Sequence, residues 1–349
     1  SIYYFNQYLI SPNKRNLFIA GIAFGIAQLM KFSAAILVGH FLALTIIWFI
    51  NKYRRENTQF RVGKFLKLNF SGLSKLFIIF VIGGLLIYPV YFLITSNYPL
   101  EKQISDTHTI LQNYAGGPTP DGQLCGPLRC LVDATILASE NDITRPYAHY
   151  LLGLLMVLDR SSEGNQLYFL GEVSNSGGPA YFPIVYALKE PLALLIMIAF
   201  ASIVTIQKIG RAIIRRGPKF REYLATNLHE FSMTLFIFVY VIYSVTSPLN
   251  IGIRHLIPIM PMMYILSIGV IKRYLETNAK KHRIKIGALF SLFAWFVIAS
   301  FATYPNYLPY FNELVGTQNG WKYVVDSNYD WGQDLKRLAK FVELNDIDK

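Results

Sequence analysis

Charged residues are scarce in this chain. Only 15% of its 349 residues are Asp, Glu, Lys or Arg, whereas an average globular protein has about 25%. Cysteine is nearly absent, with two residues, which excludes a disulfide scaffold. Apolar residues make up 53% and aromatic residues 15%, and the mean hydropathy is +0.35. This composition excludes intrinsic disorder. Because several apolar runs are long enough to cross a bilayer, the chain is predicted to be a polytopic membrane protein.

The apolar runs predict an all-α fold with about seven transmembrane helices, additional interfacial helices and two segments on the outer face. The runs are 17–31, 34–50, 76–95, 184–207, 231–247, 256–271 and 286–304. Residues 1–10 look like the tail of an earlier span, and the sequence opens with Ser rather than Met. We therefore expect a fragment whose beginning lies upstream, and whose end at residue 349 is also cut.

The predicted spans divide the chain into four parts. Residues 1–95 form transmembrane helices with an outer turn at Lys31. Residues 96–183 form an outer-face loop that carries an interfacial helix. Residues 184–304 contain four transmembrane helices, and residues 305–349 form an outer-face C-terminal segment, the start of a small outer domain.

The basic residues are distributed unevenly between the loops. Four loops hold 21 of the 33 basic residues but only four of the 21 acidic ones: 11–16, 51–75, 208–230 and 272–285. Basic loops face the cytoplasm in membrane proteins, so the long segments 96–183 and 305–349 are predicted to be extracytoplasmic, in the periplasm, the lumen or the cell exterior. The net charge of +12 is thus a consequence of topology. We predict no nucleic-acid binding, and expect the basic loops to contact anionic lipid headgroups.

Lys31 interrupts an apolar stretch of 34 residues, 17–50. Two spans of about 20 residues would need more length than this, so Lys31 is predicted to lie in a shallow outer turn between two short helices. A cation there can bind an anionic headgroup, although a lysine that snorkels from a helix end explains the position equally well. The preceding Gly21-Ile-Ala-Phe-Gly25 indicates close helix packing.

Two further cations and one histidine lie near the predicted outer interface. Arg254 and His255 occur in Asn250-Ile-Gly-Ile-Arg-His-Leu-Ile-Pro258, and Lys189 occurs in Tyr186-Ala-Leu-Lys-Glu-Pro191. Charge near a membrane is costly and usually functional, and the planar fork of Arg matches phosphate oxygens. Together with Lys31, these residues predict a lipid-phosphate site. The alternative for Lys189 is a simple ion pair with Glu190.

Aromatic and polar residues gather in the outer segments. Pro146 and the apolar run to residue 158 predict a helix in the membrane interface, closed by Asp159-Arg160. Tyr147, His149 and Tyr181 are candidates to line a sugar or acceptor cleft, and interfacial anchoring by tyrosine is the simpler alternative.

The last outer segment contains Val325-Asp-Ser-Asn-Tyr-Asp-Trp-Gly-Gln-Asp-Leu335. Asp326, Asn328 and Asp330 have the spacing of the first half of a calcium loop, but Trp331 and Arg337 replace the Gly and Glu that the loop requires. Asp326, Asp330 and Trp331 suit sugar binding better. Asp334 is also a candidate N-cap for a helix over residues 335–344.

Cys125 and Cys130 lie in one predicted outer loop. A local disulfide in an oxidising compartment and two unpaired thiols are both compatible with this spacing. No cofactor is expected, and the ligands for a divalent metal lack support in the sequence.

Several motifs occur in the order in which they are found in one family of membrane enzymes. They are Gly21-x-x-x-Gly-Ile-Ala-Gln-Leu-Met-Lys-Phe-Ser33, Arg145-Pro-Tyr147, Tyr168-Phe-Leu-Gly171, Tyr181-Phe-Pro183 with Lys189-Glu-Pro191, Ile253-Arg-His-Leu-Ile-Pro258, and Asp326-Ser-Asn-Tyr-Asp-Trp-Gly-Gln-Asp334. With these motifs the chain resembles glycosyltransferase family 39, superfamily C membrane glycosyltransferases related to protein O-mannosyltransferases and the aminoarabinose transferase.

The resemblance implies transfer of a sugar from a polyprenyl-phosphate carrier, such as dolichyl or undecaprenyl phosphate, to an acceptor protein, lipid or glycan. It also implies that Lys31, Arg254 and His255 hold the carrier phosphate. The family's acidic general base follows the first span, upstream of Ser1, so we assign no catalytic residue and expect this fragment alone to be inactive. The contrasting hypothesis is a transporter or polyprenyl-lipid-binding protein without catalysis. Transporters usually show internal repeats and charges at mid-membrane, which this sequence lacks.

Overall fold

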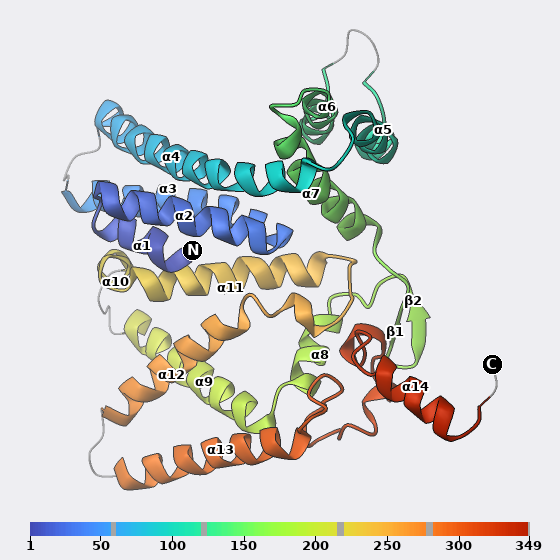
Figure 1. The fold of residues 1–349 in the computed structure, drawn as a ribbon. Helices are drawn as coiled ribbons and strands as arrows, with labels where there is room; N and C mark the ends of the chain where they lie inside the picture. Colours follow the sequence, from blue (N-terminus) through green and yellow to red (C-terminus); the bar gives the residue numbers. More distant parts are fainter. Residues whose placement is uncertain (57–60, 120–123, 215–219, 277–281, 348–349) are drawn as a thin grey trace. The chain divides into compact units, whose positions relative to one another are not determined.

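The computed structural model describes residues 1–56, 61–119, 124–214, 220–276 and 282–347, and nearly all regular structure in these ranges is helical (Figure 1). The chain divides into two compact units. Unit 1 comprises Ser1–Ser161 and Pro218–Leu235, and unit 2 comprises Ser162–Gly217 and Phe236–Lys349.

Within the described residues, five helices are long and apolar enough to cross a membrane: Phe32–Glu56, Val62–Thr95, Leu192–Arg211, Leu228–Thr246 and His282–Thr303. The expected all-α, multi-pass membrane protein is confirmed at this level. The other two predicted spans, 17–31 and 256–271, correspond to the helices α2 (Lys14–Met30) and α12 (Met260–Glu276). Each has 17 residues, fewer than the roughly 20 that cross a bilayer without tilt or thinning.

Unit 1 is built around the packing of α2 against α4 (Figure 1). Its remaining elements are α1 (Ile2–Ile10), η1 (Phe32–Ala35), α3 (Ile36–Glu56), α4 (Val62–Thr95), α5 (Leu100–Leu111), η2 (Tyr114–Gly116), α6 (Pro127–Ser139), α7 (Arg145–Glu163), α10 (Phe220–Thr226) and the start of α11 (Leu228–Thr246).

Two glycines allow the backbones of α2 and α4 to approach closely. A Cβ on Gly25 would lie 2.8 Å from the carbonyl oxygen of Gly83, and one on Gly21 would lie 2.6 Å from the Cβ of Ile82. Real side chains do not tolerate such distances, so both positions require glycine. The packing role predicted for the glycine pair is confirmed.

Three short helices of unit 1 share a small core. Leu111 of α5, Val132 of α6 and Leu155 of α7 are buried together. Arg129 fixes the connection between α5 and α6, because its guanidinium donates to the carbonyls of Gln112 (2.9 Å) and Tyr114 (2.8 Å) and pairs with Asp133. At the start of α6, Cys125 and Cys130 are joined in a disulfide. The predicted interfacial helix over 146–158 is α7, longer by five residues at its end.

Unit 2 contains a helical layer in which α9 packs against α12 and α13. Its elements are β1 (Leu167–Phe169), β2 (Glu172–Ser174), α8 (Tyr181–Lys189), α9 (Leu192–Ile214), the end of α11, η3 (Ile253–His255), α12, α13 (His282–Thr303), η5 (Gly320–Lys322), η6 (Asp326–Asn328) and α14 (Leu335–Leu344). The strands form an antiparallel hairpin whose turn, Leu170-Gly171, has positive φ at both residues, as a tight two-residue hairpin turn requires.

Prolines interrupt two of the predicted spans. The run 184–207 was expected to be one helix, but α8 ends at Lys189, Glu190 is extended (φ −82°, ψ 139°), and α9 begins at Leu192. Pro191 is the reason, because the residue before a proline avoids helical backbone and proline itself has no N–H to donate. In the run 256–271, residues 256–259 form turns around Pro258, and the helix starts only at Met260.

Candidate functional site

The candidate residues fall into two groups, one in each unit. Unit 1 holds Lys31, Tyr147 and His149, and unit 2 holds the other candidates: Tyr181, Lys189, Arg254, His255, Asp326, Asp330 and Trp331.

The Lys31 turn of unit 1 is held rigidly by its neighbours. Lys31 ends α2 with an extended backbone (φ −163°, ψ 132°) and is exposed, so the predicted turn between two helices is confirmed. Across the turn, the buried Gln28 donates to the carbonyl of Ala34 (2.9 Å) and accepts from the hydroxyl of Tyr150 (3.0 Å). These bonds fix the backbone on both sides of Lys31 and connect it to α7.

Helix α7 meets the Lys31 turn at a glycine. A Cβ on Gly153 would overlap the end of the Phe32 ring, so this glycine lets the ring approach the helix closely. Phe32 also contacts the ring of Tyr150, with centroids 5.7 Å apart. The turn that carries Lys31 therefore packs against the middle of α7.

Tyr147 and His149 lie near the start of α7 in an aromatic cluster. The hydroxyl of Tyr147 donates to the carbonyl of Gly84 (3.2 Å), and His149 packs against the rings of Tyr91 and Tyr98. Burial, followed by the positive charge of Arg145, lowers the pKa of His149. At neutral pH this histidine is a neutral ring, in which one nitrogen donates a hydrogen bond and the other accepts one.

In unit 2, a chain of hydrogen bonds connects three distant segments around η3. The side chain of Asn328 is buried; its oxygen accepts from the amide of Ile253 (3.2 Å) and its Nδ2 donates to the hydroxyl of Tyr181 (3.2 Å). The hydroxyl of Ser327 donates to the carbonyl of Ile251. These bonds fix the turn that carries Arg254.

Gly252 makes this connection sterically possible. Its φ is +106°, and a Cβ here would lie 2.6 Å from Oγ of Ser327 and 3.3 Å from Oδ1 of Asn328. Any other residue would meet both the backbone restriction and the clash. The motif around Arg254 and the motif around Asn328 thus fit together at one glycine.

Arg254 lies over an aromatic ring, with its Cζ 5.3 Å from the centroid of Trp331. Trp331 is held in turn, since its indole N–H donates to the carbonyl of Ser327 (2.6 Å). Among the described residues, no carboxylate lies within ion-pair distance of the Arg254 guanidinium. The half-buried guanidinium is therefore oriented by a ring while its charge is not neutralised, which is an arrangement suited to an anionic ligand.

An apolar cavity begins beside η3. It has a volume of about 190 Å³, and its wall is made by α8, the end of α11 and the segment after η3: Phe182, Pro183, Tyr186, Val241, Ser244, Val245, Leu256, Ile259 and Met263. Leu256 follows His255 directly, and the His255 ring lies 6.2 Å from that of Phe182. The carbonyl of His255 accepts a bond from the hydroxyl of Tyr240 (2.7 Å), which fixes the residue at this edge.

Lys189 points into the protein rather than toward Glu190. Its ammonium donates to the carbonyls of Leu308 and Asn328, both at 2.7 Å, and lies 4.5 Å from the centroid of the Phe311 ring. Burial lowers the pKa of Lys189 to about 7. The alternative of a simple Lys189–Glu190 ion pair is wrong for this structure, and the lysine instead joins α8 to the segment 305–349.

Glu190 is buried and has a different partner. The hydroxyl of Tyr264 donates to its carboxylate (2.9 Å), and burial raises the pKa of Glu190 to about 7. The fully buried Asn312 donates to the carbonyls of Ala187 (2.6 Å) and Glu190 (2.9 Å), and closes the end of α8.

Asp326, Asp330 and Trp331 are exposed, in contrast to the buried Ser327 and Asn328 between them. Asp330 accepts from the amide of Gly332 (2.8 Å). Within the described ranges, no three His, Cys, Asp or Glu side chains come together as a metal site. The helix over residues 335–344 is confirmed as α14, but Asp334 makes no side-chain cap there and pairs with Arg337 (3.3 Å).

Tyr181 connects the exposed and the buried parts of this site. It is 2% exposed, and burial raises the pKa of its hydroxyl, with the charges of Asp326 and Arg254 acting in opposite directions. Asp326, Arg254 and Tyr181, predicted from three distant motifs, therefore lie close together in unit 2.

Several residues that build these sites were not predicted. Gln28, Tyr150 and Gly153 hold the Lys31 turn. Gly252, Ser327 and Asn328 hold the Arg254 turn, and Asn312 closes the end of α8. Gly252, Ser327 and Asn328 do lie inside two of the motifs singled out in the sequence. Comparisons with protein families, with curated proteins and with solved structures found no match for this chain.

Proposed function

We propose that this protein is a membrane glycosyltransferase of family 39, which moves a sugar from a polyprenyl-phosphate carrier, dolichyl or undecaprenyl phosphate, to an acceptor on the extracytoplasmic face. The observation that carries the proposal is the Arg254 turn. It holds a guanidinium, which makes no ion pair among the described residues, over the ring of Trp331. Two residues further on, Leu256 lines an apolar cavity of about 190 Å³. A polyprenyl phosphate combines these two requirements, an anionic head and an apolar chain.

The site residues have distinct proposed roles. Arg254 and His255 are the proposed ligands of the carrier phosphate in unit 2. Lys31, exposed at its turn in unit 1, is proposed as a phosphate ligand on the resemblance alone and is tested separately. Because the Lys189 ammonium is occupied by two carbonyls, we infer that it positions Asn328 and the Arg254 turn rather than binding phosphate. A fixed cation stabilises the phosphate as the glycosidic bond breaks.

The sugar or acceptor is proposed to contact the exposed side chains of the same cluster. Trp331 offers a face for ring stacking, and the carboxylates of Asp326 and Asp330 accept from hydroxyl groups. Tyr147 and His149 are the corresponding candidates in unit 1. The acceptor is a protein, a lipid or a glycan, and we assign no general base.

The proposed topology has seven spans, with α2 and α12 crossing in addition to the five longer helices. The basic loops are cytoplasmic, following the distribution of Lys and Arg. Cysteine-accessibility labelling in intact cells tests this topology. A cysteine at Lys336 is expected to react with an impermeant reagent from outside, and one at Lys67 to be protected.

Binding of a carrier tests the function directly. The purified chain in detergent is titrated with undecaprenyl phosphate and dolichyl phosphate, and binding is followed by native mass spectrometry. Arg254→Ala is expected to weaken binding roughly 10- to 100-fold, the effect of one charge-assisted hydrogen-bonded contact. The matched control is Arg337→Ala, an exposed arginine of unit 2 that pairs with Asp334. Equal binding by both variants would contradict the phosphate assignment.

Transfer distinguishes the enzyme from a binding protein. Membranes containing the chain are supplied with a radiolabelled polyprenyl-phosphate sugar, and label in protein, lipid and glycan fractions is counted. Transfer that depends on Arg254 and Lys31 supports a glycosyltransferase. Binding that depends on Arg254 without transfer supports a polyprenyl-lipid-binding protein, the second candidate, because the cationic turn and the apolar cavity serve both.

A further inference from the structure

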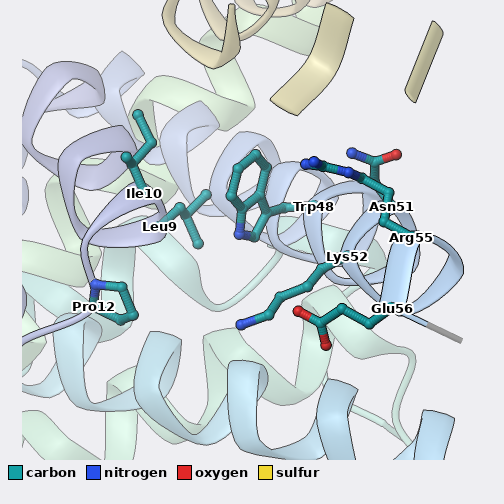
Figure 2. Close-up of a pocket in the computed structure, with 8 residues that line it drawn as sticks. All are labelled: Leu9, Ile10, Pro12, Trp48, Asn51, Lys52, Arg55 and Glu56. Carbon is teal, nitrogen blue, oxygen red and sulfur yellow. The ribbon is translucent and has the colours of Figure 1, made fainter. Parts of the chain in front are cut away.

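A second, larger cavity lies in unit 1, where α1 and α3 end. It has a volume of about 380 Å³ and is lined by apolar residues from α1 and its exit and by polar residues from α3: Leu9, Ile10, Pro12, Trp48, Asn51, Lys52, Arg55 and Glu56. Figure 2 shows the apolar side chains on one side, the polar ends of the α3 side chains on the other, and the Trp48 ring between them.

The cations of this cavity are not neutralised by any carboxylate among the described residues. Lys52 and Arg55 are exposed, and within the part of the chain that the structure describes neither forms an ion pair with a carboxylate. Glu56 lines the same cavity, so the lining carries one net positive charge. The amide nitrogen of Asn51 is already used, because it donates to the carbonyl of Arg221 (3.1 Å) and fixes this end of α3 against α10.

The position along α3 places this cavity at the surface of the bilayer. Helix α3 has 21 residues and is therefore about 32 Å long, close to the thickness of the hydrocarbon core. The cavity is built from its last three turns. Tryptophan is typical of the headgroup layer, and the apolar wall formed by Leu9, Ile10 and Pro12 suits a glycerol backbone and the first part of an acyl chain.

We propose that this cavity binds the headgroup of a singly charged anionic phospholipid, with its phosphodiester between Lys52 and Arg55 and its glycerol region against Trp48 and Ile10. The cavity volume of about 380 Å³ lies near the lower end of the roughly 300–1,000 Å³ range of small-molecule pockets. It therefore suits a headgroup rather than a whole lipid. Glu56 repels a second negative charge, so a phosphodiester is preferred over a phosphomonoester.

The test is a lipid titration of the full chain in detergent, followed by native mass spectrometry. Phosphatidylglycerol is compared with phosphatidylcholine, which has the same phosphodiester but no net charge. The chain is expected to prefer phosphatidylglycerol, and Lys52→Gln/Arg55→Gln is expected to weaken its binding roughly 30-fold, since each cation near the surface contributes about fivefold. The matched control, Arg54→Gln/Lys67→Gln, removes one Arg and one Lys that are exposed outside the cavity, and keeps the preference.

A second variant works in the opposite direction. Glu56→Gln removes the negative charge from the cavity and is expected to strengthen phosphatidylglycerol binding roughly fivefold. This gain cannot result from a folding defect. Unchanged or weaker binding would overturn the proposal, as would an equal loss in the Arg54/Lys67 control.

The source of the phosphate is tested by competition. Inorganic phosphate and glycerophosphoglycerol share the headgroup chemistry but have no acyl chains. If either one displaces phosphatidylglycerol at equal concentration, the cavity is a site for soluble phosphates and the lipid proposal is overturned. No displacement supports the lipid. Because these variants lie in α3 and the carrier test uses Arg254, the outcome of each proposal is independent of the other.

Discussion

Gly252→Ala is the substitution that most directly tests how the candidate site of unit 2 is assembled. The φ of Gly252 is +106°, and a Cβ would lie 2.6 Å from Oγ of Ser327. Two costs therefore add. The backbone conformation, which is almost restricted to glycine, costs an L-residue about 1–3 kcal/mol.

The second cost is the loss of the bonds that the clash disrupts. Displacing Ser327 breaks its bond to the Ile251 carbonyl, and moving Asn328 weakens its bond to the amide of Ile253. Each is worth about 1 kcal/mol. The total destabilisation is therefore about 3–5 kcal/mol, a large share of the 5–15 kcal/mol that stabilises a typical protein.

Thermal unfolding of the detergent-solubilised chain measures this effect. Gly287→Ala is the control, since Gly287 lies in α13 with no atom within 4 Å of its added Cβ, and alanine favours a helix by up to about 1 kcal/mol. Gly252→Ala/Ser327→Ala removes the clash with the hydroxyl and should recover only the Asn328–Ile253 bond, while the backbone cost and the loss of the Ser327–Ile251 bond remain. If Gly252→Ala unfolds at the same temperature as the control, the proposed junction between the two motifs is refuted.

Four further predictions concern other parts of the chain. Burial lowers the pKa of Lys189 from 10.5 to about 7. Between these pH values the folded protein holds fewer protons than the unfolded chain, so the free energy of unfolding rises with pH. Lys189→Met should abolish this rise, as measured by unfolding at a series of pH values. Burial raises the pKa of Glu190 from 4.5 to about 7. The contribution of Glu190 to the free energy of unfolding therefore falls as the pH rises from 4.5 to about 7, and Glu190→Gln should remove this fall. Gly25→Val should destabilise unit 1 by about 1–3 kcal/mol through overpacking, measured as a lower unfolding temperature. Cys125 and Cys130 should react with maleimide only after reduction, as read from the mass of the labelled chain.

The features that could be predicted from the sequence depend on local composition. Apolar runs identified the five helices that are long and apolar enough to cross a membrane. The single charge at Lys31 identified a turn, and the pair Gly21 and Gly25 identified a helix contact. In each case the residues that cause the structural feature lie within the segment that shows it. The breaks at Pro191 and Pro258 were equally local, but hydropathy averaged over a window hides a single residue that lacks an N–H.

The partners of buried polar groups could not be predicted in the same way. Lys189 stood next to Glu190 in the sequence, which suggested an ion pair, but the end of α8 turns the two side chains toward different acceptors and donors. The carbonyls that Lys189 contacts belong to Leu308 and Asn328, more than a hundred residues away. Which distant backbone meets a side chain is decided by tertiary packing, not by spacing.

The motif from Asp326 to Trp331 shows how structure separates two roles that a sequence motif combines. Ser327 and Asn328 are buried and hold the Arg254 turn, whereas Asp326, Asp330 and Trp331 reach the surface. Replacing a buried member therefore disturbs the junction itself, and a loss of activity there carries no information about ligands. Replacing the exposed carboxylate of Asp326 or Asp330 leaves the bonds of Ser327 and Asn328 intact. Asp326→Asn and Asp330→Asn should consequently change acceptor or sugar use without lowering the unfolding temperature, and a loss of stability in either would place that carboxylate among the structural residues.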